Sequence, residues 1–354
     1  MGLKIGLVGM PNVGKSTLFN ALLKKQQAYV ANFPFATIEP NVGIVPVPDE
    51  RLNKLKSTIE KEIASSPSSS RNDISVPIVP ATVEFVDIAG LIEGASKGEG
   101  LGNKFLSHIR EVDAICFVLR AFTDPDVIWA GHHPSDVKQG VRDPKSDFEI
   151  LKLELDLADD QTIENHMKKK NPPAGSGQVL DPNLPLFSKK PFLVVLNTDE
   201  REVARSQELE SRYAEELGIE KDQIVAVCAK IEAELSELSD EEQKEYLQAL
   251  GTRESALDKL IQKAFKTLDL MTFLTAGEKE VRAWTIRLGT TSLMASGVIH
   301  TDFMKKFIKA DVCNFDDLVA NGGWKQSREL GKVRSEGKEY IVQDGDVIEF
   351  KIGA

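Results

Sequence analysis

The chain has 354 residues, of which 41% are hydrophobic and 28% charged, and its formal net charge at pH 7 is −11. This length exceeds one ordinary core, so two or three domains are expected. The negative charge argues against a general polyanion or DNA binder, and no apolar run approaches the ~20 residues that cross a bilayer, so no membrane partner is expected.

The three cysteines are scattered and share no paired spacing. Cys116, Cys228 and Cys313 each lie in an apolar run. Buried, reduced thiols are therefore expected, which indicates a cytoplasmic location.

A phosphate-binding loop is predicted near the start of the chain. An apolar run at residues 5–8 is followed by a loop bounded by Gly9 and Gly14, and then by an apolar helical segment. Backbone N–H groups in such a loop and the positive end of the helix favour a bound phosphate. Lys15 is expected to stabilise charge on the β- and γ-phosphates, and Ser16 to bind Mg²⁺. The predicted phosphate-binding residues are Gly9, Asn12, Val13, Gly14, Lys15, Ser16 and Thr17.

Two further segments have the chemistry of a nucleotide switch. The proline-containing loop at residues 31–41 presents Thr37, a candidate Mg²⁺ ligand. In nucleotide switches such a loop is ordered only while a γ-phosphate is present. The apolar strand at residues 81–86 ends in Asp87, expected to hold Mg²⁺ through water, and Gly90, whose N–H is expected to meet the γ-phosphate.

The residue that positions the attacking water is not evident. Leu91 stands where Ras-like GTPases have a glutamine, so hydrolysis is expected to be slow or to use another residue or a partner. The glycine-rich residues 93–102 are the predicted second switch. His132 and His133 have no acidic or cysteine partner at metal spacing, which favours a solvated pair of loop histidines over metal ligands or a catalytic base.

The base-binding motif departs from that of GTPases. Residues 197–200 read Asn-Thr-Asp-Glu where GTPases have Asn-Lys-x-Asp, so Glu200 replaces the aspartate that reads guanine. A misplaced carboxylate leaves guanine donors unpaired, which favours adenine. The predicted base-site residues are Asn197, Thr198, Glu200, Cys228 and Ala229, with Asp199 pointing away. A GTPase of the same fold remains the alternative.

The pattern of elements predicts an α/β fold with a second small domain. Strands alternate with helices up to about residue 268, as in a doubly wound, mainly parallel sheet. Residues 51–63 and 147–170 have helical patterns, and residues 338–342 and 347–352 are expected to form a hairpin around 343–346. The expected domains are residues 1–128 with 191–268 for nucleotide binding, 129–190 as a helical insertion, and 270–354 as a small C-terminal domain.

Four segments together resemble the YchF/Obg-like ATPase family: residues 9–17, 32–41, 87–91 and 275–285. The resemblance covers nearly the whole chain. It implies a P-loop NTPase fold of the translation-factor class that prefers ATP, with a helical insertion and a C-terminal TGS domain of β-grasp type. By resemblance, residues 12–17 bind phosphates, Ser16 and Thr37 bind Mg²⁺, and Thr198 lies against adenine.

The resemblance also implies a ribosomal partner, expected on the large subunit through rRNA or a ribosomal protein, and roles in translation and stress responses. The insertion is shorter than is usual in the family, because only one helix precedes a Pro/Gly-rich stretch. Trp129 stands where some bacterial members carry a histidine proposed for hydrolysis, so no catalytic base is assigned.

The leading hypothesis is a slow ATPase that switches between ATP- and ADP-bound forms. By analogy with other Pro-Asn-x-Gly-Lys-Ser loops, Asn12 is expected to help hold K⁺. A scaffold that binds nucleotide without turnover is a further alternative, although a glycine-rich mobile switch argues against it. The basic residues of the C-terminal domain allow two interpretations, contact with RNA or a solvated charged face. These residues are Lys305, Lys306, Lys309, Lys325, Arg328 and Lys332.

Overall fold

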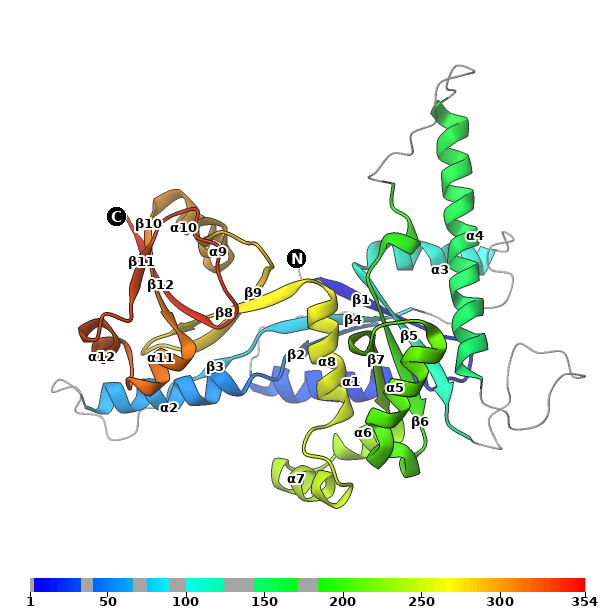
Figure 1. The fold of residues 1–354 in the computed structure, drawn as a ribbon, viewed down its shortest axis with the longest axis horizontal. Helices are drawn as coiled ribbons and strands as arrows, with labels where there is room; N and C mark the ends of the chain where they lie inside the picture. The colour runs from blue at the N-terminus through cyan, green and yellow to red at the C-terminus, as the bar shows by residue number, and fades with distance from the viewer. Residues whose placement is uncertain are drawn as a thin grey trace, which may run out of the picture. The chain divides into compact units, whose positions relative to one another are not determined.

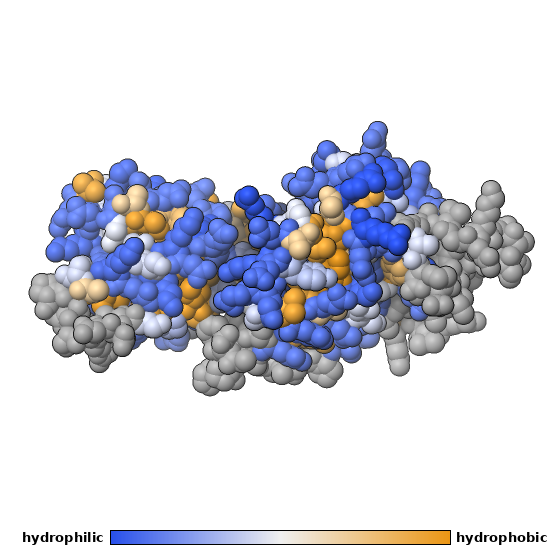
Figure 2. Space-filling model, turned by 90° about the horizontal axis from the view of Figure 1, so that it is seen from below, coloured by the Kyte–Doolittle hydropathy of each residue, from blue (hydrophilic) through white to orange (hydrophobic). Residues whose placement is uncertain are grey.

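The computed structural model describes residues 3–32, 41–65, 75–88, 100–123, 143–170 and 184–353. The chain divides into two compact units, one of Met1–Val45 with Val83–Thr267 and one of Pro46–Thr82 with Leu268–Ala354 (Figure 1). On the face drawn in Figure 2, hydrophilic residues predominate and hydrophobic side chains form separate patches. None of the helices in the described ranges is long and apolar enough to cross a membrane.

The first unit is built on a mainly parallel sheet, as the sequence predicts. Its strand order is β2-β4-β1-β5-β6-β7. The adjacent pairs from β4 to β7 are parallel. The strand bounds are β1 (Lys4–Val8), β2 (Val42–Pro46), β4 (Thr82–Asp87), β5 (Ala114–Ala121), β6 (Phe192–Thr198) and β7 (Ile224–Val227).

The central strands β5 and β6 are almost continuously apolar because a parallel sheet is covered on both faces. Residues 115–119 and 193–196 in these strands are at most 3% exposed. The helices of this unit are α1 (Lys15–Asn32), α3 (Gly100–Glu111), α4 (Pro144–Lys170), α5 (Ser206–Leu217), α6 (Ala229–Leu235), α7 (Asp240–Ala249) and α8 (Ala256–Thr267), with 3-10 turns at Phe187–Lys189, Glu200–Arg205 and Lys221–Gln223.

Helix α4 lies within the predicted insertion and packs on β5 through Phe148, whose ring lies edge-on to Phe117 with 5.3 Å between the ring centroids. The returning chain is tied to this helix by Asp159, whose carboxylate accepts hydrogen bonds from the backbone N–H groups of Phe187 (2.7 Å) and Ser188 (2.9 Å). Residues 124–142 and 171–183 lie outside the described ranges, so the shortened insertion stays a prediction.

The second unit contains a mixed sheet with the strand order β11-β10-β12-β8-β9-β3. The hairpin β8–β9 is followed by helices and further strands, and the last strand, β12, returns parallel to β8, which is the β-grasp arrangement the sequence predicts. The strand bounds are β3 (Ile78–Val79), β8 (Leu270–Ala276), β9 (Val281–Arg287), β10 (Phe307–Asn314), β11 (Arg334–Glu336) and β12 (Asp346–Ile352). The helices are α2 (Glu50–Ala64), α9 (Ser292–Ile299), α10 (Thr301–Lys306), α11 (Phe315–Ala320) and α12 (Trp324–Glu329).

The predicted hairpin of residues 338–352 is wrong. The backbone carbonyls of Lys338 and Tyr340 instead accept hydrogen bonds from the first amides of α9, at 3.3 and 2.8 Å. Strand β12 pairs with β10 and β8, because its apolar side chains Val347 and Ile348 are needed in the centre of the sheet.

Residues 46–82 group with the second unit, although the sequence placed them in the nucleotide-binding domain. The helix predicted at 51–63 is present as α2, and its apolar stripe of Leu52, Leu55 and Ile59 is at most 2% exposed. Strand β3 pairs with β9 and so extends the C-terminal sheet. Helical periodicity identified α2, but periodicity carries no information on which sheet a helix covers.

Glu232 joins two helices of the first unit. Its side chain is 4% exposed, and its Oε1 accepts the backbone N–H of Ala256, at the start of α8, at 2.8 Å. Burial raises the pKa of the Glu232 carboxyl, and nearby Lys25 and the α8 amides oppose that shift. These first amides have no acceptor within their own helix, so the carboxylate acts as a cap from outside.

We expect Glu232→Ala to lower the free energy of unfolding by about 2 kcal/mol, because buried amides lose their acceptor. Urea unfolding followed by circular dichroism measures this. The matched control is Glu234→Ala on the exposed side of the same helix, expected to change stability by less than about 0.5 kcal/mol. Equal effects of the two substitutions would contradict the capping role.

Candidate nucleotide-binding site

The turn between β1 and α1 has the backbone geometry of a phosphate loop. Asn12 and Gly14 have positive φ angles of 63° and 88°. A Cβ at Gly14 would lie 2.1 Å from Asn197 Nδ2, and one at Gly9 would lie 2.6 Å from the Val118 carbonyl oxygen. Both positions therefore require glycine. The first N–H groups of α1 lack helical acceptors and, with the positive helix end, favour an anion at this turn.

Lys15 and Asp87 meet at the phosphate loop. Lys15 is 9% exposed, and its Nζ lies 2.7 Å from Asp87 Oδ1. Lys15 is the first residue of α1 and Asp87 the last of β4, which pairs directly with β1. The sheet therefore brings together two predicted site residues that are 72 positions apart in the sequence.

The donor set at this point fits Mg²⁺. The Ser16 side chain is exposed at the start of α1, beside Lys15, and the Asp87 carboxylate lies against the Lys15 ammonium group. Hydroxyl and carboxylate oxygens are ligands that Mg²⁺ prefers, alongside substrate phosphates and water. Within the described ranges, no group of three His, Cys, Asp or Glu side chains could hold a metal ion. Thr37 and Gly90 lie outside the described residues.

Asn197 connects the phosphate loop to the loop after β7. Its side chain is 7% exposed. Its Nδ2 donates to the Val13 carbonyl at 2.9 Å, and its Oδ1 accepts the Ala229 N–H at 3.1 Å. A primary amide side chain supplies both the donor and the acceptor that these two contacts require, in one plane.

The carboxylates of the base motif have protein partners. Glu200 is exposed, and its Oε1 lies 2.6 Å from Lys230 Nζ. Asp199 accepts the backbone N–H of Thr123 through both oxygens, each at 3.2 Å. The hydrogen bond and charge of Glu200 raise the pKa of Lys230. The sequence did not single out Lys230 or Thr123; the signal available for Lys230 was its place directly after Cys228 and Ala229.

The remaining predicted base-site residues are buried. Thr198 is 4% exposed and Cys228 is 5% exposed. Cys228 precedes α6 and packs with Ile231 and Leu235, against side chains of α7 and its flanks. Burial raises the pKa of the Cys228 thiol, which therefore stays neutral and apolar. In β5, burial raises the pKa of Cys116 to about 12. All three cysteines are free and buried, as the sequence predicts.

Most of the candidate RNA-binding cations of the second unit are paired with carboxylates. Lys309 pairs with Asp311 at 2.8 Å and Lys332 with Asp317 at 3.2 Å. Lys305 pairs with Asp302 at 3.4 Å, and Arg328 with Glu349 at 2.5 Å. Such pairing lowers the net positive potential that attracts phosphates.

Comparison with known proteins gives matches at both ends of the chain. A family model described as "50S ribosome-binding GTPase" matches residues 4–143. A second, for the C-terminal region of YchF GTPases and described as a protein of unknown function, matches residues 270–353.

Full-length relatives are also found. The "Ribosome-binding ATPase YchF" of Bacillus subtilis (strain 168) is 45% identical over 386 residues, and that of Escherichia coli O157:H7 is 41% identical over 383; each alignment covers 99% of both chains. The structure of the Schizosaccharomyces pombe YchF GTPase matches with a TM-score of 0.78 and 33% identity, covering 99% of this chain and 98% of that one. Because the alignments are longer than the 354 residues of this chain, the bacterial relatives contain residues without a counterpart here.

We expect Asn197→Ala to weaken nucleotide binding by about tenfold or more. The substitution leaves the Val13 carbonyl and the Ala229 N–H buried without their partner, at about 1–3 kcal/mol each. Calorimetric titration with ADP measures the change. The control is Asn20→Ala on the exposed face of α1, for which unchanged affinity is expected. Wild-type affinity in Asn197→Ala would contradict the connecting role of this residue.

Proposed function

The chain belongs to the YchF family of P-loop proteins, and on that basis we propose that it binds ATP in preference to GTP, hydrolyses it slowly and associates with the ribosome. The names of the relatives support ATP hydrolysis and ribosome binding. The large subunit is the favoured partner because the matching family model is described as 50S ribosome-binding.

The observation that carries the adenine preference is the engagement of both acidic side chains of the base motif. A guanine reader must present a carboxylate to two base N–H donors. Here Glu200 pairs with Lys230, and Asp199 accepts the Thr123 N–H. Guanine donors must then compete with Lys230 and the Thr123 N–H for these oxygens, and a donor left unpaired costs about 1–3 kcal/mol, whereas adenine presents an acceptor where guanine has its ring N–H donor.

The proposed reaction is in-line attack of water on the γ-phosphate. The backbone N–H groups of the loop at residues 12–17 hold the phosphates, and Lys15 exchanges its partner Asp87 for phosphate oxygens. Ser16 and Asp87, with Thr37, would hold Mg²⁺, which when bound neutralises charge on the β- and γ-oxygens. Gly90 is proposed to donate its N–H to the γ-phosphate.

Turnover is proposed to be slow because Leu91 cannot polarise water. In related systems a supplied arginine accelerates hydrolysis by roughly 10³–10⁵. We also propose that Asn12, which is exposed in the phosphate loop and has a left-handed backbone conformation, helps to hold a K⁺ ion. A cytoplasmic location follows from a ribosomal partner and reduced, buried thiols.

The proposed domains are a nucleotide-binding domain, a shortened helical insertion and a C-terminal TGS domain. Alignments that extend beyond the length of this chain support the shortening. Contact with rRNA through the C-terminal domain is less favoured than contact with a ribosomal protein, because most of its candidate cations are paired within the unit.

Calorimetry with ADP and with GDP tests the base preference. We expect ADP to bind at least about tenfold more tightly than GDP. A tenfold difference in affinity corresponds to about 1.4 kcal/mol, which is within the cost of one unpaired buried donor. Equal affinities, or tighter GDP binding, would sink the adenine proposal and leave a GTPase of the same fold.

Hydrolysis rates in KCl and NaCl test the potassium proposal. At equal ionic strength, phosphate release from ATP is expected to be faster in KCl, because Asn12 would help to hold the ion beside the phosphates. Lys15→Met, which lacks the ammonium group, is the inactive control. Identical rates in the two salts would remove the K⁺ site, and undiminished activity of Lys15→Met would remove Lys15 from the reaction.

A further inference from the structure

Residues 46–82 are an integral part of the C-terminal unit. Strand β3 pairs with β9, matching Ile78 with Val281. Phe273 and Leu274 are successive residues of β8 and both are fully buried, so both faces of that strand are covered. Helix α9 lies with the cluster that contains Phe273. Helix α2 also contacts β8 and β9 and buries its own apolar stripe.

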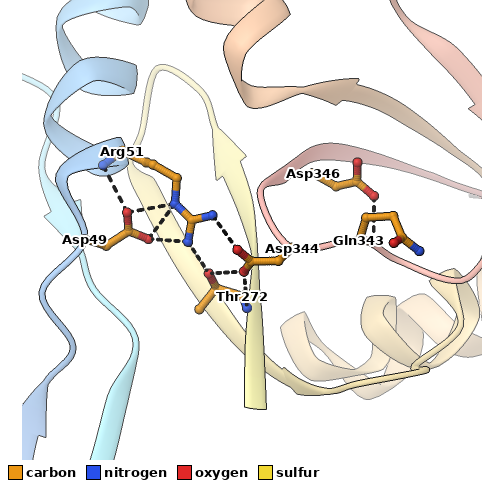
Figure 3. Close-up of polar contacts among 6 residues, drawn as sticks. All are labelled: Asp49, Arg51, Thr272, Gln343, Asp344 and Asp346. Carbon is orange, nitrogen blue, oxygen red and sulfur yellow. Dashed lines mark hydrogen bonds and ion pairs between the residues drawn. The ribbon is translucent and has the colours of Figure 1, made fainter. Parts of the chain in front are cut away.

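Arg51 anchors the beginning of α2 to this sheet (Figure 3). Its guanidinium group donates to the Asp49 carboxylate at 2.8 Å, to Thr272 Oγ1 at 2.9 Å and to Asp344 Oδ2 at 2.9 Å. Asp344 in turn accepts the Thr272 N–H at 3.1 Å. The hydrogen bond that Arg51 donates to Asp49 makes the largest contribution to raising the pKa of Arg51. One side chain thus ties α2 to β8 and to the turn before β12.

Glu62 anchors the other end of α2. Its two carboxylate oxygens accept the backbone N–H groups of Trp324 (3.0 Å) and Lys325 (2.7 Å), the first residues of α12. Gly323 has a φ of 125°, and a Cβ there would lie 2.2 Å from Glu62 Oε2. The carboxylate therefore sits closely against the start of α12, and α2 is held at both ends.

Residues 46–82 are connected through β2 and β4 to the phosphate site. The N–H of Asp87 donates to the Asn41 carbonyl at 2.9 Å, and the N–H of Val47 donates to the Ala81 carbonyl at 2.8 Å. Strands β2 and β4 are therefore antiparallel and form a ribbon about 20 Å long at the usual rise per residue. One end of the ribbon carries Asp87, the partner of Lys15, and the other end continues into α2 and β3.

We propose that this β2–β4 ribbon and α2 transmit the nucleotide state of the phosphate site to the C-terminal unit, an inference that rests on the proposed function. A triphosphate competes with Asp87 for Lys15. When it binds, Asp87, the last residue of β4, loses its ion pair with Lys15. Because Asp87 and Asn41 are hydrogen-bonded, both strands of the ribbon respond together. Arg51 and Glu62 pass the change on to β8 and α12. By linkage, a partner bound to the C-terminal unit changes nucleotide affinity in return.

Hydrogen exchange of the full chain tests this route. Exchange is compared without nucleotide and with ADP or a non-hydrolysable ATP analogue, each with Mg²⁺. We expect the ATP analogue to change exchange rates in residues 270–287 and 324–329 about fivefold or more, the lower end of typical coupling. In Arg51→Ala, measured at saturating nucleotide, the change should persist at residues 41–47 and 81–87 and disappear at 270–287.

Two further variants separate transmission from general destabilisation. Arg51→Lys keeps the charge but cannot bridge three partners, so a reduced response is expected if Arg51→Ala does not fold. Lys309→Ala removes a cation that pairs with Asp311 and makes no hydrogen bond to residues 46–82 among those described, so it should respond like the wild type.

The outcomes distinguish this inference from the proposed function. A wild-type chain that binds no adenine nucleotide overturns both. Nucleotide binding without any change at residues 270–287 overturns the coupling alone, as does an undiminished change in folded Arg51→Ala or Arg51→Lys.

Discussion

One buried amide side chain sets the geometry of the nucleotide site. Asn197 bonds the Val13 carbonyl in the phosphate loop and the Ala229 N–H in the loop after β7. The two loops follow β1 and β7, and Asn197 lies near the end of β6. Because these strands run in the same direction in one sheet, their carboxyl ends lie on the same side of it. A ligand that spans phosphate and base needs both loops at a fixed separation, which local sequence preferences alone cannot supply.

The Lys15–Asp87 pair gives this edge a second property. The Lys15 ammonium group must give up its carboxylate partner when it binds phosphate. Phosphate binding therefore changes the contacts of Asp87 at the end of β4. Because β4 is hydrogen-bonded to β2 and both continue into residues 46–82, the phosphate site and the C-terminal sheet share one continuous segment. Hydrogen bonds of Arg51 and Glu62 tie α2, which follows β2 in this segment, to Thr272 and to the start of α12.

Local chemistry made the phosphate loop, the parallel sheet and a separate small C-terminal domain predictable, and the β-grasp type of that domain came from the family resemblance. A glycine-bounded turn between an apolar strand and a helix is recognisable within nine residues. The hairpin predicted at 338–352 was wrong because β12 pairs with β10 and β8, which are distant in the sequence. The placement of residues 46–82 was missed because the apolar stripe of α2 is compatible with packing in either domain. The pairing of Lys230 with Glu200 was not predicted, because Lys230 lies in α6 and Glu200 in the 3-10 turn after β6, 30 positions earlier in the sequence.

A crystal structure of the full chain with Mg²⁺ and a non-hydrolysable ATP analogue would show directly whether this loop holds the phosphates. We expect the β-phosphate to lie within the main-chain N–H groups of residues 12–17, with Lys15 Nζ moved from Asp87 to a phosphate oxygen. A nucleotide bound elsewhere, or a bound nucleotide with Lys15 still paired to Asp87, would contradict it.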